Sequence, residues 1–151
     1  MMHRIRLLVT GLALIAPAVA MAASGVVMHR DPGCPCCSKW AQIVARELGR
    51  AVRTVDEADR PALHQRLGVP TDVASCHTTV IDGYVFEGHV PVADVKRLLA
   101  QRPRGVKGLA VAGMPLGSPG MEVPGRSADA YEVIAFGPAG RRVFARHGGG
   151  R

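Results

Sequence analysis

The stretch DPGCPCCSKW, from Asp31 to Trp40, places three of the four cysteines of the chain within four positions. The residues before it, 25–30, read as a short strand, and the segment DPG is typical of a turn. Apolar residues then recur at helical spacing from Trp40 to Leu48, and Gly49 provides a helix stop. The stretch therefore predicts a strand, a turn rich in thiols and a helix, with the cysteines at the N-terminus of the helix.

The chain continues this alternation of strands and helices. Periodicity predicts three further single elements: a strand over 51–56, a helix over 60–67 and a helix over 92–100. Two apolar runs, 78–81 and 84–87, are joined by Asp82-Gly83 and predict a hairpin. The resulting order, βαβα followed by ββα, predicts an α/β protein with a thioredoxin-like fold, in which helices flank a central mixed sheet.

The last third of the chain adds two features to this core. Residues 104–125 are rich in glycine and proline and predict an irregular loop that lies on the domain. The runs 131–136 and 141–144 predict a closing hairpin, and the glycine-rich end after it a frayed tail. We therefore expect a Gly/Pro-rich loop and a C-terminal hairpin extension.

Residues 1–23 have the layout of a secretory signal peptide. Arg4 and Arg6 precede an apolar run, and small residues follow near Ala22. The apolar run is shorter than the roughly 20 residues that a membrane span needs, and Pro17 interrupts it. An uncleaved N-terminal anchor is the alternative. We expect cleavage, export to the periplasm, and a single domain over residues 24–151 that has no membrane contact after signal removal.

The charge of the chain argues against a nucleic-acid partner. The formal net charge is +7, from 19 basic and 12 acidic residues. The basic residues of the second half are spread out, without a dense run, an interleaved aromatic patch or a recognition helix. The excess therefore predicts a solvated basic surface and no nucleic-acid binding.

The cysteine pattern leaves several chemistries open. An even number of cysteines in an oxidising compartment usually forms disulfides, but adjacent Cys36 and Cys37 could pair with each other only through a strained ring. Cys34 and Cys37 form a Cys-x-x-Cys pair at a helix N-terminus, which favours thiolates. Thiolate is both the nucleophile of disulfide exchange and a metal ligand. The motif by itself supports redox chemistry and metal binding equally.

Further soft donors lie in two other regions. Cys76 and His77 precede the predicted hairpin, and His89 follows it at the same open end, so the three residues can approach one another. The alternative for His77 is a capping or hydrogen-bonded loop histidine, and the alternative for His89 is a structural polar residue that precedes the next helix. Met114 and Met121 lie in the Gly/Pro-rich loop. A role as gap-filling core residues is the alternative for them, although there is little core to fill in this loop. Two other histidines are expected elsewhere: His64 on an exposed helix position and His147 in the loose tail.

This donor set favours copper over other metals. Zinc needs only four cysteines or histidines, whereas thioethers suit Cu(I). Adjacent Cys36 and Cys37 resist joining one mononuclear shell, and bridging thiolates in a multicopper cluster would explain their crowding.

The runs GCPCCSKW, SCHT, GYVFEGHVP and AGMPLGSPGME resemble the CopG-type family of periplasmic proteins linked to bacterial copper resistance. The likeness extends from Val26 to about Phe144, with four motifs in the same order. It implies a thioredoxin-like fold and a cysteine-ligated copper site, with a polynuclear, redox-active cluster as a further expectation. By motif, the metal-site residues of the family carry over to Cys34, Cys36, Cys37, Cys76, His77, His89, Met114 and Met121.

Three functional hypotheses follow. The first is a periplasmic copper-resistance protein that binds Cu(I) through cysteine, histidine and methionine. It would sequester the ion or, as a copper oxidoreductase, interconvert its oxidation states, with other periplasmic copper-handling proteins as partners. The second is a thiol–disulfide oxidoreductase with Cys34 as nucleophile and Cys37 as resolving thiol. The third is a binding module whose cysteines are structural disulfides. Only the first has a use for Met114 and Met121.

Overall fold

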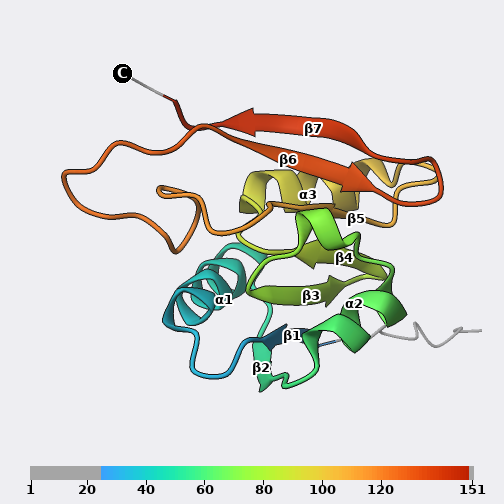
Figure 1. Cartoon of the computed structure of the whole chain (residues 1–151), viewed down its shortest axis with the longest axis horizontal. Coiled ribbons are helices and arrows are strands. Elements are labelled where there is room, and N and C mark those ends of the chain that lie inside the picture. The colour runs from blue at the N-terminus through green and yellow to red at the C-terminus, as the bar shows by residue number, and fades with distance from the viewer. Residues whose placement is uncertain (1–24, 150–151) are drawn as a thin grey trace, which may run out of the picture.

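A computed structural model of the chain describes residues 25–149 (Figure 1). The predicted signal peptide, residues 1–23, lies outside the described residues. In chain order the elements are β1 (Val26–Arg30), α1 (Pro35–Leu48), β2 (Val52–Asp56), α2 (Arg60–Leu67), the 3₁₀ turn η1 (Thr71–Val73), β3 (His77–Ile81), β4 (Tyr84–Glu87), α3 (Val92–Gln101), β5 (Gly108–Ala110), β6 (Tyr131–Phe136) and β7 (Arg142–His147).

All seven strands of the described chain form one mixed sheet in the order β2-β1-β3-β4-β5-β6-β7. The strand β1 is parallel to β2 and antiparallel to β3, and β3 is antiparallel to β4. These four strands have the arrangement expected of a thioredoxin-like core. The sheet then continues through β5, parallel to β4, to the antiparallel hairpin β6–β7. The predicted α/β class with a central mixed sheet and helices is confirmed.

Helices cover both faces of the sheet. The larger core contains Trp40 and Val44 of α1, Leu98 of α3 and Phe86 of β4. A smaller core on the other face contains Val85, and Leu67 of α2 packs against it. Neighbouring residues of a strand point to opposite faces, which is why Val85 and Phe86 belong to different cores.

The helix α1 starts at the thiol turn for local reasons. The Cys34 side chain caps it by accepting the Cys37 N–H at 3.3 Å, and Pro35 occupies its first position. Gly49, with φ of 62°, ends the helix in the left-handed conformation. The cysteines therefore lie at the positive end of a 14-residue helix, as the sequence predicts.

Three local predictions are wrong. The segment expected to be an irregular loop contains β5, where Gly108 lies so close to β4 that a Cβ would meet the Val85 carbonyl oxygen at 2.0 Å. His147 is the last residue of β7, and its Nε2 lies 2.6 Å from Asp94 Oδ2. His64 is only 8% exposed, because the face of α2 that carries it lies against buried polar groups of the sheet.

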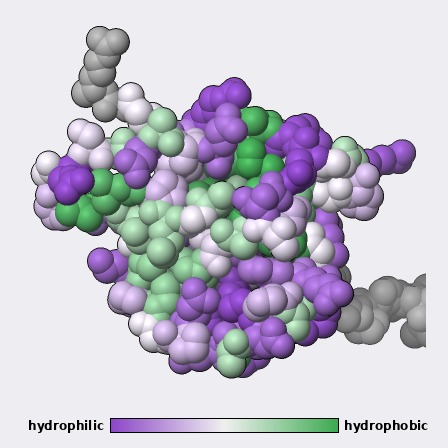
Figure 2. All heavy atoms as spheres, in the orientation of Figure 1, coloured by the Kyte–Doolittle hydropathy of each residue, from purple (hydrophilic) through white to green (hydrophobic). Residues whose placement is uncertain are grey.

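The rest of the Gly/Pro-rich segment is a long connection between β5 and β6, which extends beside α1 in Figure 1. In Figure 2 this protruding loop shows one hydrophobic patch among hydrophilic residues, and Met114 and Val123 are exposed large apolar residues of the connection. None of the helices within residues 25–149 has the length and apolar character needed to span a membrane.

Candidate metal centre

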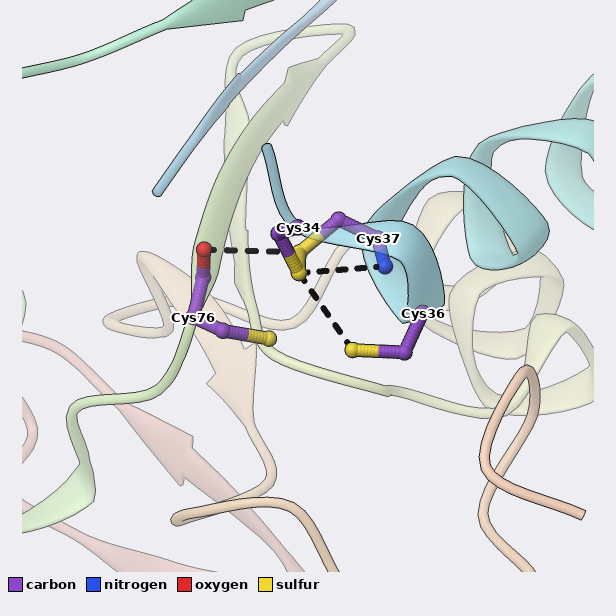
Figure 3. Close-up of side chains that lie close together, drawn as sticks. All are labelled: Cys34, Cys36, Cys37 and Cys76. Carbon is purple, nitrogen blue, oxygen red and sulfur yellow. Dashed lines mark hydrogen bonds between the residues drawn. A yellow bond between two sulfur atoms is a disulfide. The ribbon is translucent and has the colours of Figure 1, made fainter. Parts of the chain in front are cut away.

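The structure brings all four cysteines together. Cys34, Cys36 and Cys37 lie at the start of α1, and Cys76 immediately precedes β3. Their Sγ atoms lie within 4.8 Å of one another, and Figure 3 shows the Cys76 side chain directed toward the first turn of α1. A backbone hydrogen bond of 2.9 Å from the Asp31 N–H to the Cys76 carbonyl holds the thiol turn against the start of β3.

Two of these sulfurs are oxidised. Cys34 and Cys37 form a disulfide, whereas Cys36 and Cys76 are free thiols (Figure 3). The Cys36 Sγ lies 3.3 Å from the Cys34 Sγ. A framework of two disulfides would have to pair Cys36 with Cys76 here, and that bond is absent between these described residues.

Cys76 belongs to a second group as well, with His77 and His89. Its Sγ lies 3.2 Å from His89 Nε2 and 3.5 Å from His77 Nδ1. His77 opens β3 and His89 follows β4, and the two strands are joined by the predicted hairpin. The Gly88 N–H donates to the His77 carbonyl at 2.8 Å, which closes the open end of the hairpin around the two rings.

A backbone contact fixes the tautomer of His89. Its Nδ1 lies 2.8 Å from the Pro119 carbonyl oxygen, which can only accept, so Nδ1 carries the proton. Burial lowers the pKa of His89 despite the opposing effects of this carbonyl and of Glu122. The neutral ring therefore presents the lone pair of Nε2 toward Cys76. This is the orientation that metal-binding histidines obtain from an outer hydrogen bond.

His77 is more deeply buried and has an unpaired nitrogen. Its Nε2 has no hydrogen-bond partner among the described residues, and its ring lies 4.6 Å from the Trp40 ring. Burial, followed by the electrostatic effects of His89 and Arg60, lowers the pKa of His77 well below its usual value. The ring is a neutral base in an apolar setting, and a buried unpaired nitrogen calls for a ligand or an ordered water.

The Cys76 thiol is protonated at neutral pH in the metal-free protein. Burial, followed by the nearby Cys36, raises its pKa to about 12. The side chain is only 6% exposed, so a thiolate there lacks solvation. A bound cation would supply the missing positive charge, and its binding would release the thiol proton.

The loop with the two predicted methionine ligands is attached at the rim of this centre. Gly113, before Met114, donates its N–H to the Ala74 carbonyl at 3.2 Å. Gly120, before Met121, packs on α1 so closely that a Cβ would lie 2.9 Å from the Cys36 carbonyl oxygen. The Met114 side chain is 53% exposed and Met121 is half-buried. The structure thus brings the loop backbone to the cysteines and leaves Met114 at the solvent side.

A buried ion pair, not predicted from the sequence, lies beside the centre. Glu87 is fully buried, and it accepts hydrogen bonds from Arg60 Nη2 at 3.0 Å and from the Ser75 N–H at 2.7 Å. Burial raises the pKa of Glu87 to about 7, although its hydrogen bond from Thr78 and the Arg60 charge oppose the shift. One signal was present: alternation in the strand 84–87 places Glu87 on the same buried face as Val85, and a carboxylate there needs a cationic partner.

Comparison with known proteins gives two kinds of match. A family model described as "Protein of unknown function, DUF411" matches residues 73–121. Two solved structures, described as copper resistance protein copG, forms 1 and 2, are each 44% identical to the chain. Form 1 has a TM-score of 0.74 and the match covers 83% of this chain and 98% of that one. For form 2 the values are 0.73, 82% and 97%. No curated protein sequence matches the chain.

Proposed function

The chain belongs to the family of the copper resistance protein CopG, and on that premise we propose that it is a periplasmic protein that binds Cu(I) for copper resistance. The observation that carries the proposal is the position of Cys76 in two donor groups at once. Thiolate and imidazole are soft ligands of the kind that select Cu(I). The proposed ligands are Cys34, Cys36, Cys37, Cys76, His77 and His89, with Met114 and Met121 contributed by the loop.

The donor count supports more than one copper ion. Four sulfurs lie in one group, and Cys76 joins two imidazoles in the other. A single tetrahedral ion would need only four of these six donors. A thiolate shared between groups supports a polynuclear cluster, and such a cluster could change its oxidation state.

Loading the complete centre requires reduction of the disulfide. Thiolates bind metal, and Cys34 and Cys37 are a cystine in this structure. Two electrons and two protons, supplied by a dithiol reductant, convert this bond to two thiols. Reduced protein should therefore bind more Cu(I) than oxidised protein.

The cellular setting follows from residues 1–23, whose signal-peptide layout supports export to the periplasm. There the protein would receive copper from, or deliver it to, other periplasmic copper-handling proteins. The half-exposed Met114 at the rim suits the exchange of a soft ion.

A competition titration tests the proposal. The reduced chain, without residues 1–23, is titrated with Cu(I) against a coloured Cu(I) chelator, and we expect more than one ion per chain. Cys76→Ser should lose more capacity than Cys36→Ser, because Cys76 belongs to both groups and Cys36 to one. Weak or substoichiometric binding that Cys76→Ser leaves unchanged contradicts the proposal.

The Cys34–Cys37 disulfide at the helix N-terminus favours thiol–disulfide exchange as a second candidate. The reduced pair would pass two electrons to a substrate disulfide through a mixed disulfide at Cys34, which Cys37 resolves. Insulin reduction measures this activity, which should fail in Cys34→Ser and need no metal. Absence of turnover by the wild type contradicts this candidate.

A further inference from the structure

We propose that Arg60 and Glu87 are positioning residues that hold Cys76 in the metal centre from the opposite face of the sheet. The inference rests on the proposed copper-binding function. Neither residue offers a donor atom to the two groups described above. The Arg60 and Glu87 side chains are 10% and 0% exposed, respectively, and their ion pair is 3.0 Å long.

The pair lies behind the centre. Successive residues of a strand face opposite sides, so His77 and Thr78 diverge at the start of β3. The His77 ring contacts Trp40 of α1, whereas Thr78 Oγ1 accepts a hydrogen bond of 2.9 Å from Arg60 Nη1 of α2. Glu87 is paired with Thr78 across the β3–β4 ladder and lies on the α2 side.

The two charges hold both backbone polar groups of the residue before Cys76. Glu87 Oε1 accepts the Ser75 N–H at 2.7 Å, and Arg60 Nη2 donates to the Ser75 carbonyl at 3.1 Å. That carbonyl belongs to the peptide bond that joins Ser75 to Cys76. The direction in which the Cys76 side chain leaves the backbone is therefore fixed by the ion pair.

Arg60 also reaches the thiol turn. Its Nε lies 3.3 Å from Asp31 Oδ1, and its Nη1 donates to the His29 carbonyl at 3.1 Å. The Asp31 N–H in turn donates to the Cys76 carbonyl at 2.9 Å. One guanidinium thus connects the turn that precedes the three clustered cysteines to the segment that carries Cys76.

The same carboxylate connects Cys76 to the histidine side. Glu87 precedes His89 by two residues. The backbone carbonyl of Glu87 accepts a hydrogen bond of 3.0 Å from the Val111 N–H, which holds this segment in place. Its side chain holds Ser75, as described above. The pair therefore links the three segments that carry the proposed cysteine and histidine ligands.

These contacts require the planar fork of arginine. Arg60 Nη1 and Nη2 donate hydrogen bonds to different partners at once, while Nε lies at ion-pair distance from Asp31 without donating a hydrogen bond. Lysine has one compact ammonium group and cannot reproduce this geometry. Arg60→Lys keeps the positive charge but loses the hydrogen bonds to several partners. The variant therefore distinguishes a positioning role of Arg60 from a role in neutralising Glu87.

The experiment compares Cu(I) affinity with stability in the full reduced chain. Arg60→Lys should weaken Cu(I) binding by about 10- to 100-fold, the range found when outer hydrogen bonds to metal ligands are removed. Glu87→Gln keeps an acceptor for the Ser75 N–H and should lose less. Arg97→Lys, in an ion pair with Asp94 on α3, is the matched control and should bind as the wild type does. Val133→Ala, a core truncation in β6, controls for lost stability.

A second readout does not depend on copper. With the Cys34–Cys37 disulfide intact, iodoacetamide labelling of Cys76 is followed by mass spectrometry of its peptide. Release of the Ser75–Cys76 segment should expose the buried thiol, so Arg60→Lys should label at least tenfold faster than Arg97→Lys and Val133→Ala.

The outcomes separate the two proposals. If the wild type binds no Cu(I), the proposed function fails, and the labelling rates still decide the positioning role. If Arg60→Lys binds and labels as Val133→Ala does, the positioning role fails and copper binding stands. If Arg60→Lys does not fold, Glu87→Gln decides: wild-type affinity together with a wild-type labelling rate overturns the inference.

Discussion

Gly120 shows how one residue controls the approach of the loop to the cysteines. Its φ is +88°, a conformation that residues with a side chain rarely adopt. A Cβ there would lie 2.9 Å from the Cys36 carbonyl oxygen and 3.0 Å from the Trp40 backbone nitrogen. Both are backbone atoms of α1 and cannot turn aside. Close packing of the segment with Met121 on α1 therefore depends on a glycine at this position.

We expect Gly120→Ala to lower the free energy of unfolding by about 1–3 kcal/mol, from the positive φ and the contact with α1. It should also weaken Cu(I) binding, because the loop moves away from Cys36. Thermal unfolding and chelator competition measure the two effects. Gly125→Ala is the control: its φ is +76°, and nothing lies within 4 Å of its Cβ position. Equal stability and equal Cu(I) affinity of the two variants would contradict the role of the contact.

At the scale of elements, the hairpin β6–β7 is attached to α3 by a small polar cluster. Asp94, in the first turn of α3, is only 4% exposed and lies 2.6 Å from His147 Nε2 and 2.9 Å from Arg97 Nη2. Arg97 also donates to the Phe144 carbonyl at 3.0 Å, and its Cζ lies 4.0 Å from the centroid of the Phe144 ring. These contacts fix the edge of the sheet that lies farthest from β1.

His147→Ala should destabilise the fold, because it leaves a buried Asp94 oxygen without its partner. The expected loss is about 1–3 kcal/mol in the free energy of unfolding, measured in urea. Arg146→Ala on the same strand removes a largely exposed ion pair with Glu132 and should cost less than about 1 kcal/mol. Cu(I) affinity should be unchanged in both variants. A His147→Ala protein as stable as Arg146→Ala would show that the cluster does not hold the hairpin.

Local chemistry explains which elements could be predicted from the sequence. Asp82-Gly83 adopts positive φ at both residues, as its hairpin prediction requires, and α2 spans the predicted 60–67. The strand β5 was missed because its three residues begin with glycine and are held by their neighbours in the sheet. Arg60 and Glu87 are 27 positions apart, and no local pattern shows that one guanidinium reaches that carboxylate. The grouping of the cysteines and histidines could be predicted from the sequence, because hairpin geometry and helix capping depend on local residues.

At the scale of the molecule, the proposed cysteine and histidine ligands come from the start of α1, the start of β3 and the segment just after β4, and the proposed methionines from the loop between β5 and β6. These segments are brought together only by folding, although Cys34, Cys36 and Cys37 are close together in the unfolded chain too. Copper that binds the complete centre should therefore favour the folded state.

We expect Cu(I) to raise the melting temperature of the reduced protein, increasingly with free copper concentration. At about one hundred times the dissociation constant, the gain is about 2.7 kcal/mol when the unfolded chain does not bind. The reduced Cys76→Ser variant is the control, because it keeps the local cysteine cluster and lacks the sulfur common to both groups. Equal stabilisation of wild type and variant would show that copper recognises the short motif rather than the folded centre.

The dual membership of Cys76 has a consequence for filling order. A thiolate carries one negative charge, and an ion on one side withdraws electron density from the side that faces the histidines. The first copper to arrive would therefore change the donor strength met by the second, so successive equilibrium constants should differ instead of repeating. Two donor groups that share one sulfur atom should therefore fill in steps, with a distinct form in which only one group holds copper.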